Sequence, residues 1–316
     1  MHQNDPLFVV NPKKLCPACG GGRRERKRCE ACKASGFLPV DLSGLWSPQP
    51  GFLVGGGPSL NSMPFDRLRE RGVVSMAVNN VAGHVPVTAW TFGDPPTKFH
   101  HGLHLDPKCL TFAPIGKLRQ PIHIKMPSGR WRVSDILVKD CPGTFGFARS
   151  GQFNAPTFLT DWFAHWGHGG KESDGKKQPF RCLASMLLVV RLMHYLGCPR
   201  IYMIGVDFWM TEEAAYAFGQ DKSARNGRYA KENAMLREIK PVCEAAGFKI
   251  FNCNPKSRCD VFEYVPFDRA VQDCRGGVPK EPFDLADWYS KHIAEQHIAE
   301  NPVPITLDGV RRAFNP

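Results

Sequence analysis

The sequence predicts an α/β fold, in which a mostly parallel sheet carries helices on both faces and a small four-cysteine unit comes before it. Three observations support this prediction. Short apolar runs recur along the chain, helical periodicity fills the gaps between the later runs, and two Cys-x-x-Cys pairs lie near the N-terminus. Continuous apolar strands that alternate with helices are typical of parallel sheets covered on both faces.

The cysteine unit is the first element. Its two pairs, nine residues apart, are formed by Cys16, Cys19, Cys29 and Cys32. Four thiolates at this spacing fit a tetrahedral zinc ion, whereas a redox dithiol, the alternative, needs only one pair. Because a unit this small has no apolar core of its own, we expect a structural zinc ion to supply its folding free energy.

The N-terminal part of the chain is strongly basic. Residues 1–40 contain eight Lys/Arg and three Asp/Glu, while the whole chain has a formal net charge of +11. Residues 23–28, between the two cysteine pairs, contain five Lys/Arg. A basic loop held by zinc suits phosphate contact, so we predict a nucleic-acid partner for this unit. A solvated turn is the alternative.

The next element is a short apolar strand, Phe52-Leu53-Val54, which leads into Gly55-Gly56-Gly57-Pro58-Ser59. Glycines let a backbone approach a phosphate closely, and the start of a helix favours the negative charge. The loop has neither the Gly-Lys-Ser/Thr of a Walker loop nor the third glycine of the GxGxxG dinucleotide fingerprint. We therefore predict a nucleotide-binding loop of another kind; a plain tight turn is the alternative.

The remaining elements follow in chain order. Residues 183–196 and 231–246 have helical periodicity and end before Gly197 and Gly247, which suit left-handed C-caps. The other expected elements are a helix at residues 63–71 and strands at residues 73–78, 88–92, 109–112, 122–124, 200–206 and 248–251.

Polar side chains stand at or just after the ends of several of these strands. They are Ser59, Asn79, Asp94, Asp207 and Asn254. The carboxyl ends of parallel strands meet at one edge of a sheet, and ligands bind such sheets at that edge. The sequence therefore predicts a binding site there.

Composition divides the chain into four predicted parts. Residues 1–38 form the basic zinc-binding unit, residues 39–50 a turn-rich linker, residues 51–269 the nucleotide-binding domain, and residues 270–316 a C-terminal extension. No apolar run is long enough to span a bilayer, and the first residues lack the pattern of a secretory signal. We therefore expect a cytoplasmic protein without a membrane partner.

The glycine loop resembles the first motif of a known group of enzymes. Gly-x-Gly-Pro-Ser-Leu after a first strand is similar to the loop of the bacterial sialyltransferases that act on lipooligosaccharide, and of the archaeal hydroxymethylpterin pyrophosphokinases. The resemblance covers residues 51–269 and implies a Rossmann-like, GT-A-like domain that binds a nucleotide donor. Its later segments are residues 79–80, 94–95, 184–186, 196–208, 215–218 and 251–257.

The resemblance implies roles in donor binding. Gly55, Gly56, Gly57 and Ser59 would line the donor phosphates, with Asn79 nearby, and Ser185 matches a serine that contacts the nucleotide. The same resemblance implies that Tyr216 steadies the leaving phosphate, and Trp209 stands where the family has a second tyrosine.

The general base remains open. The family's histidine falls near residues 227–229, Gly-Arg-Tyr, where no histidine stands, and arginine is not a base at neutral pH. Asp94, at the position of a donor-contacting asparagine in the sialyltransferases, is one candidate. Asp207 is a second, and the loop histidines His165 and His168 are further alternatives.

The sequence also contains no Asp-x-Asp pair, which metal-dependent sugar transferases commonly use to hold a cation on the donor. This favours metal-free stabilisation of the leaving group by Tyr216, Arg225 or Arg228. It disfavours a kinase, which needs magnesium on ATP.

We therefore predict a metal-independent glycosyltransferase that uses a nucleotide-sugar donor. The basic zinc unit could bind a polyanionic acceptor, and DNA with a hydroxymethylated base is one such acceptor. With this acceptor, the chain would be a phage-type DNA-modifying enzyme. The alternatives are an ATP-dependent diphosphokinase acting on a small alcohol and a nucleotide-binding module without catalytic activity.

Overall fold

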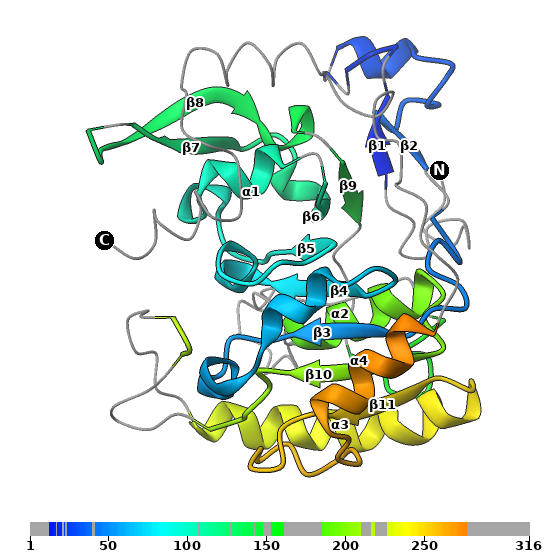
Figure 1. Ribbon diagram of the computed structural model, residues 1–316. Coiled ribbons are helices and arrows are strands. Elements are labelled where there is room, and N and C mark those ends of the chain that lie inside the picture. The colour runs from blue at the N-terminus through cyan, green and yellow to red at the C-terminus, as the bar shows by residue number, and fades with distance from the viewer. Residues whose placement is uncertain are drawn as a thin grey trace. The chain divides into compact units, whose positions relative to one another are not determined.

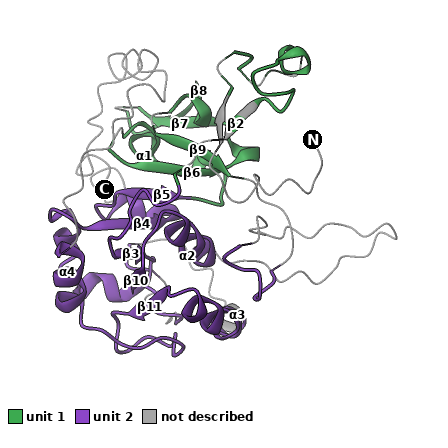
Figure 2. Ribbon diagram, turned by 90° about the vertical axis from the view of Figure 1, so that its right-hand side faces the viewer, with its two compact units in different colours: residues 1–42, 92–148, 283–316 green, residues 43–91, 149–282 purple. Residues whose placement is uncertain are grey.

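The computed structural model divides into two compact units, shown in different colours in Figure 2. The first unit consists of Met1–Leu42, Phe92–Ala148 and Phe283–Pro316, and the second of Ser43–Thr91 and Arg149–Pro282. The structure describes residues 13–16, 18–20, 22, 24–39, 42–106, 108–126, 128–141, 143–147, 153–160, 185–209, 216–218 and 226–276.

The second unit contains a parallel sheet with the strand order β11-β10-β3-β4-β5 (Figure 1). Its strands are β3 (Gly51–Val54), β4 (Val74–Val78), β5 (Ala89–Thr91), β10 (Arg200–Ile204) and β11 (Lys249–Asn252). The chain runs outward from β3 through β4 to β5, and then returns to β10 on the other side of β3. The strand order therefore reverses between β3 and β10, and parallel α/β sheets bind ligands outside the carboxyl ends of the strands at such a point.

Helices cover both faces of this sheet, as predicted (Figure 2). They are α2 (Ser185–Tyr195), α3 (Asn226–Ala245) and α4 (Phe267–Arg275). Neighbouring residues of β3 point to opposite faces. A Cβ on Gly51 would lie 2.6 Å from Met193 of α2, whereas the ring of Phe52 packs 5.5 Å from that of Phe267 in α4. The fully buried strand β3 is thus enclosed between α2 and α4.

The glycines that end α2 and α3 adopt the expected left-handed conformation, with φ of 91° at Gly197 and 71° at Gly247. The helix predicted at residues 63–71 is wrong in type. The 3-10 helix η3 (Pro58–Ser62) ends just before this region, and only the short 3-10 helix η4 (Phe65–Arg69) lies within it. Met63 is extended because it precedes a proline, and Gly72 with φ of 92° ends the segment, so too few residues remain for an α-helix.

The first unit contains a second group of strands. β6 (Leu110–Pro114) pairs in parallel with β9 (Thr144–Phe147), and β1 (Lys13–Leu15) pairs antiparallel with both β9 and β2 (Phe37–Pro39). β7 (Pro121–Lys125) and β8 (Trp131–Leu137) form a separate antiparallel hairpin. Since β1 and β2 flank the four cysteines, the cysteine unit is joined to the strands of this unit through β1.

The short helix α1 (His101–Leu105) brings buried histidines into the first unit. His100 and His104 are fully buried, and His101 is 2% exposed. The rings of His100 and His101 stack 4.1 Å apart, and His104 packs against the edges of two phenylalanines. Burial lowers the pKa of His100 and of His104 to about 3, so both are neutral at pH 7.

Candidate functional site

The glycine loop lies at the carboxyl ends of β3 and β10, and it is bound tightly to the loop that follows β10. The N–H of Gly55 donates to the carbonyl of Ile204 at 2.8 Å, and the N–H of Gly57 donates to that of Gly205 at 2.7 Å. A Cβ on Gly57 would lie 2.5 Å from Oδ2 of Asp207. The group that approaches Gly57 closely is therefore the loop that follows β10.

Gly55 and Gly205 show the same close approach. A Cβ on Gly55 would lie 2.5 Å from the carbonyl oxygen of Gly205, and a Cβ on Gly205 would clash with the carbonyl oxygen of Gly55. Gly205 also has a φ of 62°, which other residues rarely adopt. The glycines at this edge of the sheet are thus required for the packing of two loops against each other.

Asp207 joins three loops at this edge. Its Oδ2 accepts the Ser59 N–H at 2.8 Å, and its Oδ1 accepts both the Ser59 hydroxyl at 2.5 Å and the Asn254 side-chain amide at 2.8 Å. These residues follow β3, β10 and β11. The predicted convergence of Ser59, Asp207 and Asn254 is therefore present, but the Ser59 donors that we expected to face a phosphate bind the Asp207 carboxylate.

The segment Tyr216–Phe218 lies against the glycine loop. The N–H of Ala217 donates to the carbonyl of Gly56 at 3.0 Å, and a Cβ on Gly56 would lie 3.4 Å from Cδ1 of Tyr216. The ring of Phe218 stacks on His84 with a centroid distance of 4.1 Å and an interplanar angle of 7°. Sequence reasoning missed His84, although it follows β4 by only a few residues.

Two hydrogen-bond donors at this place have no partner among the residues that the structure describes. They are the N–H of Gly56 and the hydroxyl of Tyr216, which is half-buried. Every other N–H from Gly55 to Leu60 that can donate is bound to a carbonyl or to Asp207. The capacity of the loop to bind a ligand therefore rests on Gly56 and Tyr216.

A cation lies beside the Asp207 loop. The backbone N–H of Arg258 donates to the carbonyl of Asp207 at 2.8 Å, and its guanidinium lies 3.1 Å from the centroid of the Trp209 ring. Both side chains are exposed. Stacking on an aromatic face fixes a guanidinium without neutralising it. Sequence reasoning missed Arg258, whose signal was its position four residues after Asn254.

Asn79 and Ser185 also belong to the second unit. Asn79 begins the 3-10 helix η5 (Asn79–Gly83) with a φ of 52°, and its carbonyl accepts the Trp90 indole N–H at 2.9 Å. Val81 of this helix lies 3.0 Å from the Cβ position of Gly56. Ser185 begins α2, whose other end leads into the start of β10, so Ser185 lies toward the carboxyl edge of the sheet.

The other candidate catalytic residues have different surroundings. Asp94 belongs to the first unit, where it is exposed and forms an ion pair with Lys98 at 3.2 Å. Arg228 lies in α3, but its side chain is outside the described residues, as are Arg225, His165 and His168. None of these can be placed at the glycine loop, and their roles stay predictions.

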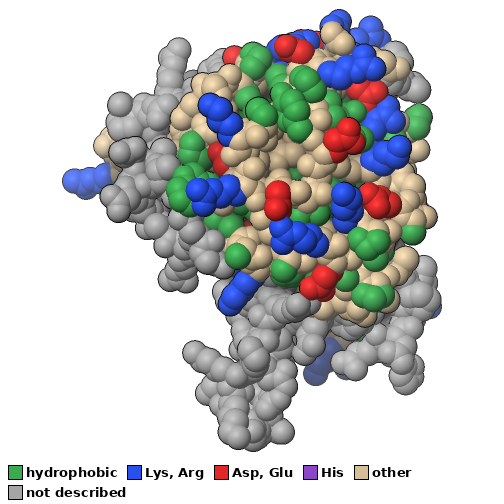
Figure 3. Space-filling model, turned by 90° about the horizontal axis from the view of Figure 1, so that it is seen from below, with side chains coloured by type: hydrophobic (Ala, Val, Ile, Leu, Met, Phe, Trp, Pro, Cys, Tyr) green, Lys and Arg blue, Asp and Glu red, His purple; other side chains and the backbone are tan. Residues whose placement is uncertain are grey.

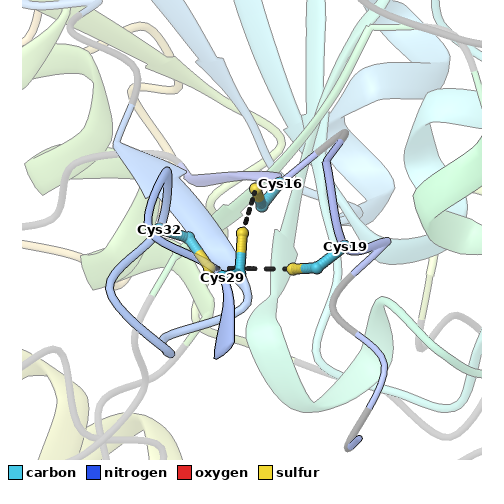
Figure 4. A group of neighbouring side chains, drawn as sticks. All are labelled: Cys16, Cys19, Cys29 and Cys32. Atoms are coloured by element: carbon cyan, nitrogen blue, oxygen red, sulfur yellow. Dashed lines mark hydrogen bonds between the residues drawn. The ribbon is translucent and has the colours of Figure 1, made fainter. Parts of the chain in front are cut away.

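The four cysteine side chains converge in the first unit (Figure 4). Their sulfur atoms all lie within 4.8 Å of one another, with 3.7 Å between Cys16 and Cys29 and 3.6 Å between Cys19 and Cys32. A zinc ion 2.3 Å from four tetrahedral sulfurs separates them by about 3.8 Å. All four thiols are free, so the arrangement fits a zinc site and not a disulfide pair.

Backbone groups support this cluster. The N–H of Gly36 donates to the sulfur of Cys32 at 3.2 Å, and the N–H of Cys16 donates to the carbonyl of Gly36. Burial raises the pKa of the Cys32 thiol, but the Gly36 N–H and the neighbouring cysteines together lower it to about 7. Such N–H···S bonds are typical of thiolate ligands around a metal, because they stabilise the charged form.

The basic loop forms the 3-10 helix η2 (Glu25–Arg28) and the turn before it. Arg24, Lys27 and Arg28 are exposed, and Arg26 is half-buried. In the part of the chain that the structure describes, the loop therefore presents a positively charged surface next to the cysteines.

Comparisons with known proteins give one match. No protein-family model matches the chain, and no curated protein matches it. Among solved structures, a sialyltransferase in complex with a trisaccharide acceptor and CMP matches 80% of this chain and all of its own, with 15% sequence identity and a TM-score of 0.40. A structural similarity with this TM-score and sequence identity does not assign an activity or a ligand to the chain. None of the described helices has the length and apolar character needed to cross a membrane.

Proposed function

We propose that the second unit binds the phosphate of a nucleotide-sugar at the reversal point between β3 and β10, and that the protein transfers the sugar to an acceptor without a metal ion. One observation carries the proposal: the Tyr216 ring packs against Gly56 at the carboxyl edge of the sheet, and neither the Tyr216 hydroxyl nor the Gly56 N–H has a partner among the described residues. Neutral donors of this kind stabilise a phosphate oxygen as it gains charge.

In the proposed reaction, an acceptor hydroxyl oxygen bonds to the anomeric carbon while the bond from this carbon to the donor phosphate breaks. The phosphate leaves with the electron pair, and the hydroxyl proton passes to a base. Tyr216 would donate to the leaving oxygen, and the fixed cation of Arg258 would offset part of its charge. Together these groups do the work that a metal ion does in other sugar transferases.

Asp207 and Ser59 have a supporting role in this proposal. The two Asp207 oxygens accept three hydrogen bonds, so the carboxylate holds the three loops in place. Through its two bonds to Asp207, Ser59 fixes the glycine loop so that the Gly56 N–H can face a ligand. Asp207 is then a positioning residue and not the base. Asp94 belongs to the first unit, where it is exposed and pairs with Lys98, and its role as the base stays a prediction from the sequence.

For the first unit, we propose a structural zinc ion on Cys16, Cys19, Cys29 and Cys32, which the sulfur separations support. The exposed basic residues beside it support a polyanionic acceptor, and DNA with a hydroxymethylated base is the acceptor we propose. Two alternatives remain: an ATP-dependent diphosphokinase acting on a small alcohol, and a nucleotide-binding module without activity.

Thermal-shift measurements with CMP, UDP, GDP and ATP, each with and without magnesium, identify the donor class. We expect stabilisation by one of the nucleotides without magnesium, since binding to the folded state raises the unfolding temperature. Stabilisation by ATP with magnesium alone would favour the diphosphokinase. Hydrolysis of the matching nucleotide-sugar in the absence of an acceptor separates an enzyme from an inactive module.

The variant Tyr216→Phe tests the catalytic role of the hydroxyl. It should lower kcat by about 10²- to 10³-fold with little change in donor affinity, because the hydroxyl acts mainly in the transition state. Tyr264→Phe is the matched control: Tyr264 is 47% exposed and bridges to Asn252 of β11. An unchanged kcat for Tyr216→Phe, or an equal loss in the control, would refute the proposed site.

A further inference from the structure

The hairpin β7–β8 of the first unit has one buried and one exposed face. Ile122 and Ile124 of β7 and Ser134 and Ile136 of β8 are buried. The opposite face carries two of the most exposed large apolar side chains among the described residues, Trp131 at 43% and Val133 at 56%.

Cross-strand pairing adds basic side chains to the exposed face. Lys125 is paired with Trp131, and His123 with Val133, so each pair lies on one face of the ribbon. Arg130 precedes Trp131 and is exposed, but the alternation of side chains along β8 places it with Arg132 on the other face of the ribbon. We call Lys125, Trp131 and Val133 the hairpin platform.

The Trp131 ring has a fixed orientation. It packs against the His100 ring at 5.8 Å with an interplanar angle of 77°, and against the His123 ring at 6.5 Å. His100 is fully buried and bonded to the backbone N–H of Gly102, so it does not move freely. The indole is thus held in place from one side while much of its surface stays exposed.

Basic residues outnumber acidic residues around the platform. Residues 115–137 contain five Lys/Arg and one acidic residue, Asp135, which is exposed on the same face as Trp131 and Val133. On the face of the molecule seen in Figure 3, by contrast, acidic and basic side chains alternate. Pairs such as Arg237–Asp260 and Arg67–Asp268, in the second unit, neutralise each other in this way.

We propose that the hairpin platform binds single-stranded nucleic acid. A base stacks on the Trp131 indole, and Lys125 contacts a flanking phosphate. Positive charge combined with an exposed, preorganised aromatic ring is the combination that single strands use, because every base has a face that can stack. The platform shares no residue with the glycine loop or with the basic loop beside the cysteines, so its test does not depend on the proposed sugar transfer.

Fluorescence anisotropy of labelled 12-nucleotide oligo-dT with the full-length protein tests this proposal. Trp131→Ala should weaken binding about 5- to 150-fold, the effect of losing one stacked base, and Trp131→Phe should keep most of the affinity. Binding of inorganic polyphosphate, which has charge but no bases, should be the same in all three proteins. Thermal unfolding of each variant shows whether it is folded.

Charge variants complete the test. Lys125→Gln should reduce the slope of log affinity against log salt by about 0.7, the value for one phosphate contact on a single strand. Arg132→Gln is the matched control, because Arg132 pairs with Ile124 on the other face of the ribbon. Oligo-dT binding that does not change in Trp131→Ala, or an equal loss of polyphosphate binding, overturns the proposal. Binding of an acidic peptide with the same dependence on Trp131 would do so as well.

Discussion

The two units of this protein have clusters of polar groups that differ in chemical state. In the first unit these groups are cysteine sulfurs arranged for a metal and histidines that burial keeps neutral. In the second unit they are carboxylates with several donors each. Asp207 accepts three hydrogen bonds at the glycine loop, and Asp273 has a similar position at the opposite end of the sheet.

Asp273 shows how the second unit uses such a carboxylate. It lies in α4 and accepts two hydrogen bonds from Arg200, at 2.5 and 2.6 Å, and one from the Tyr202 hydroxyl at 2.5 Å. The Arg200 guanidinium is the main cause that lowers the pKa of Asp273. The ionised carboxylate thus ties α4 to the start of β10.

Because of this difference, we expect different solution conditions to destabilise the two units. The first unit has neutral buried histidines and, as we propose, a zinc ion on its cysteines, so we expect mild acid and chelators to act on it. The second depends on ionised carboxylates and on close loop packing, so it tolerates both until the carboxylates take up protons. Three experiments test this contrast.

The largest effect is expected from removing zinc. A strong chelator should abolish the folded structure of residues 13–39, since zinc binding to such units supplies about 10–16 kcal/mol. Hydrogen exchange followed by mass spectrometry should show loss of amide protection in β1 and β2, with little change in β3, β4 and β10. Metal analysis before chelation should give about one zinc per chain. Zinc-free protein with the same protection, or a disulfide between these cysteines, would contradict the zinc site.

A smaller effect is expected from Gly57→Ala in the second unit. The new Cβ would overlap Oδ2 of Asp207 and the carbonyl of Gly205, so the loop must shift and lose bonds to Asp207. We expect urea unfolding to show a loss of about 3 kcal/mol in the free energy of unfolding of this unit. Gly276→Ala is the control, because its Cβ would meet its nearest neighbour at 3.6 Å and its φ is −70°. Equal stability of the two variants would show that the loop packs less tightly than described.

The smallest effect is expected from mild acid on the first unit. The unfolded chain takes up protons on His100 and His104 as the pH falls through about 6.5, whereas the folded unit resists until about 3. The stability that these neutral histidines provide is therefore present at neutral pH and lost as the pH falls. From pH 6.5 to 5.5 the loss should be about 1 kcal/mol for each histidine.

Urea unfolding at these pH values, followed by hydrogen exchange in β6 and β7, measures this loss. Besides burial, His101, Lys125 and His104 lower the pKa of His100, and His101 lowers that of His104. His104→Phe, which cannot take up a proton, should remove about half of the pH dependence. The same dependence in wild type and variant would exclude His104 as a source.

The parallel sheet could be predicted because each of its strands is a short apolar run that can be recognised from its own residues. The bounds of four strands differ from those of the predicted segments by at most two residues; these strands are β3, β4, β10 and β11. The cysteine cluster could be predicted for a similar reason. Its four cysteines lie within 17 residues of the sequence, so a short segment alone can bring them together around one metal ion.

The details of the glycine loop could not be predicted in this way. A run of glycines indicates that something approaches the backbone closely, but it does not say what approaches. Here the approaching groups are Gly205 and Asp207, which are about 150 residues away in the chain. His84 and Arg258 were missed for the same reason, since their partners Phe218 and Trp209 come close only in the folded unit.

The loop packing also affects how natural variation in relatives of this chain should be interpreted. Gly55, Gly57 and Gly205 would persist in a relative that had lost every ligand, because any side chain there collides with its own backbone or with Asp207. Their retention through evolution is therefore evidence for the fold alone. Selection for a ligand would appear instead at Tyr216 and Arg258, whose replacement costs the packed loops little and which a lineage released from the activity is free to change.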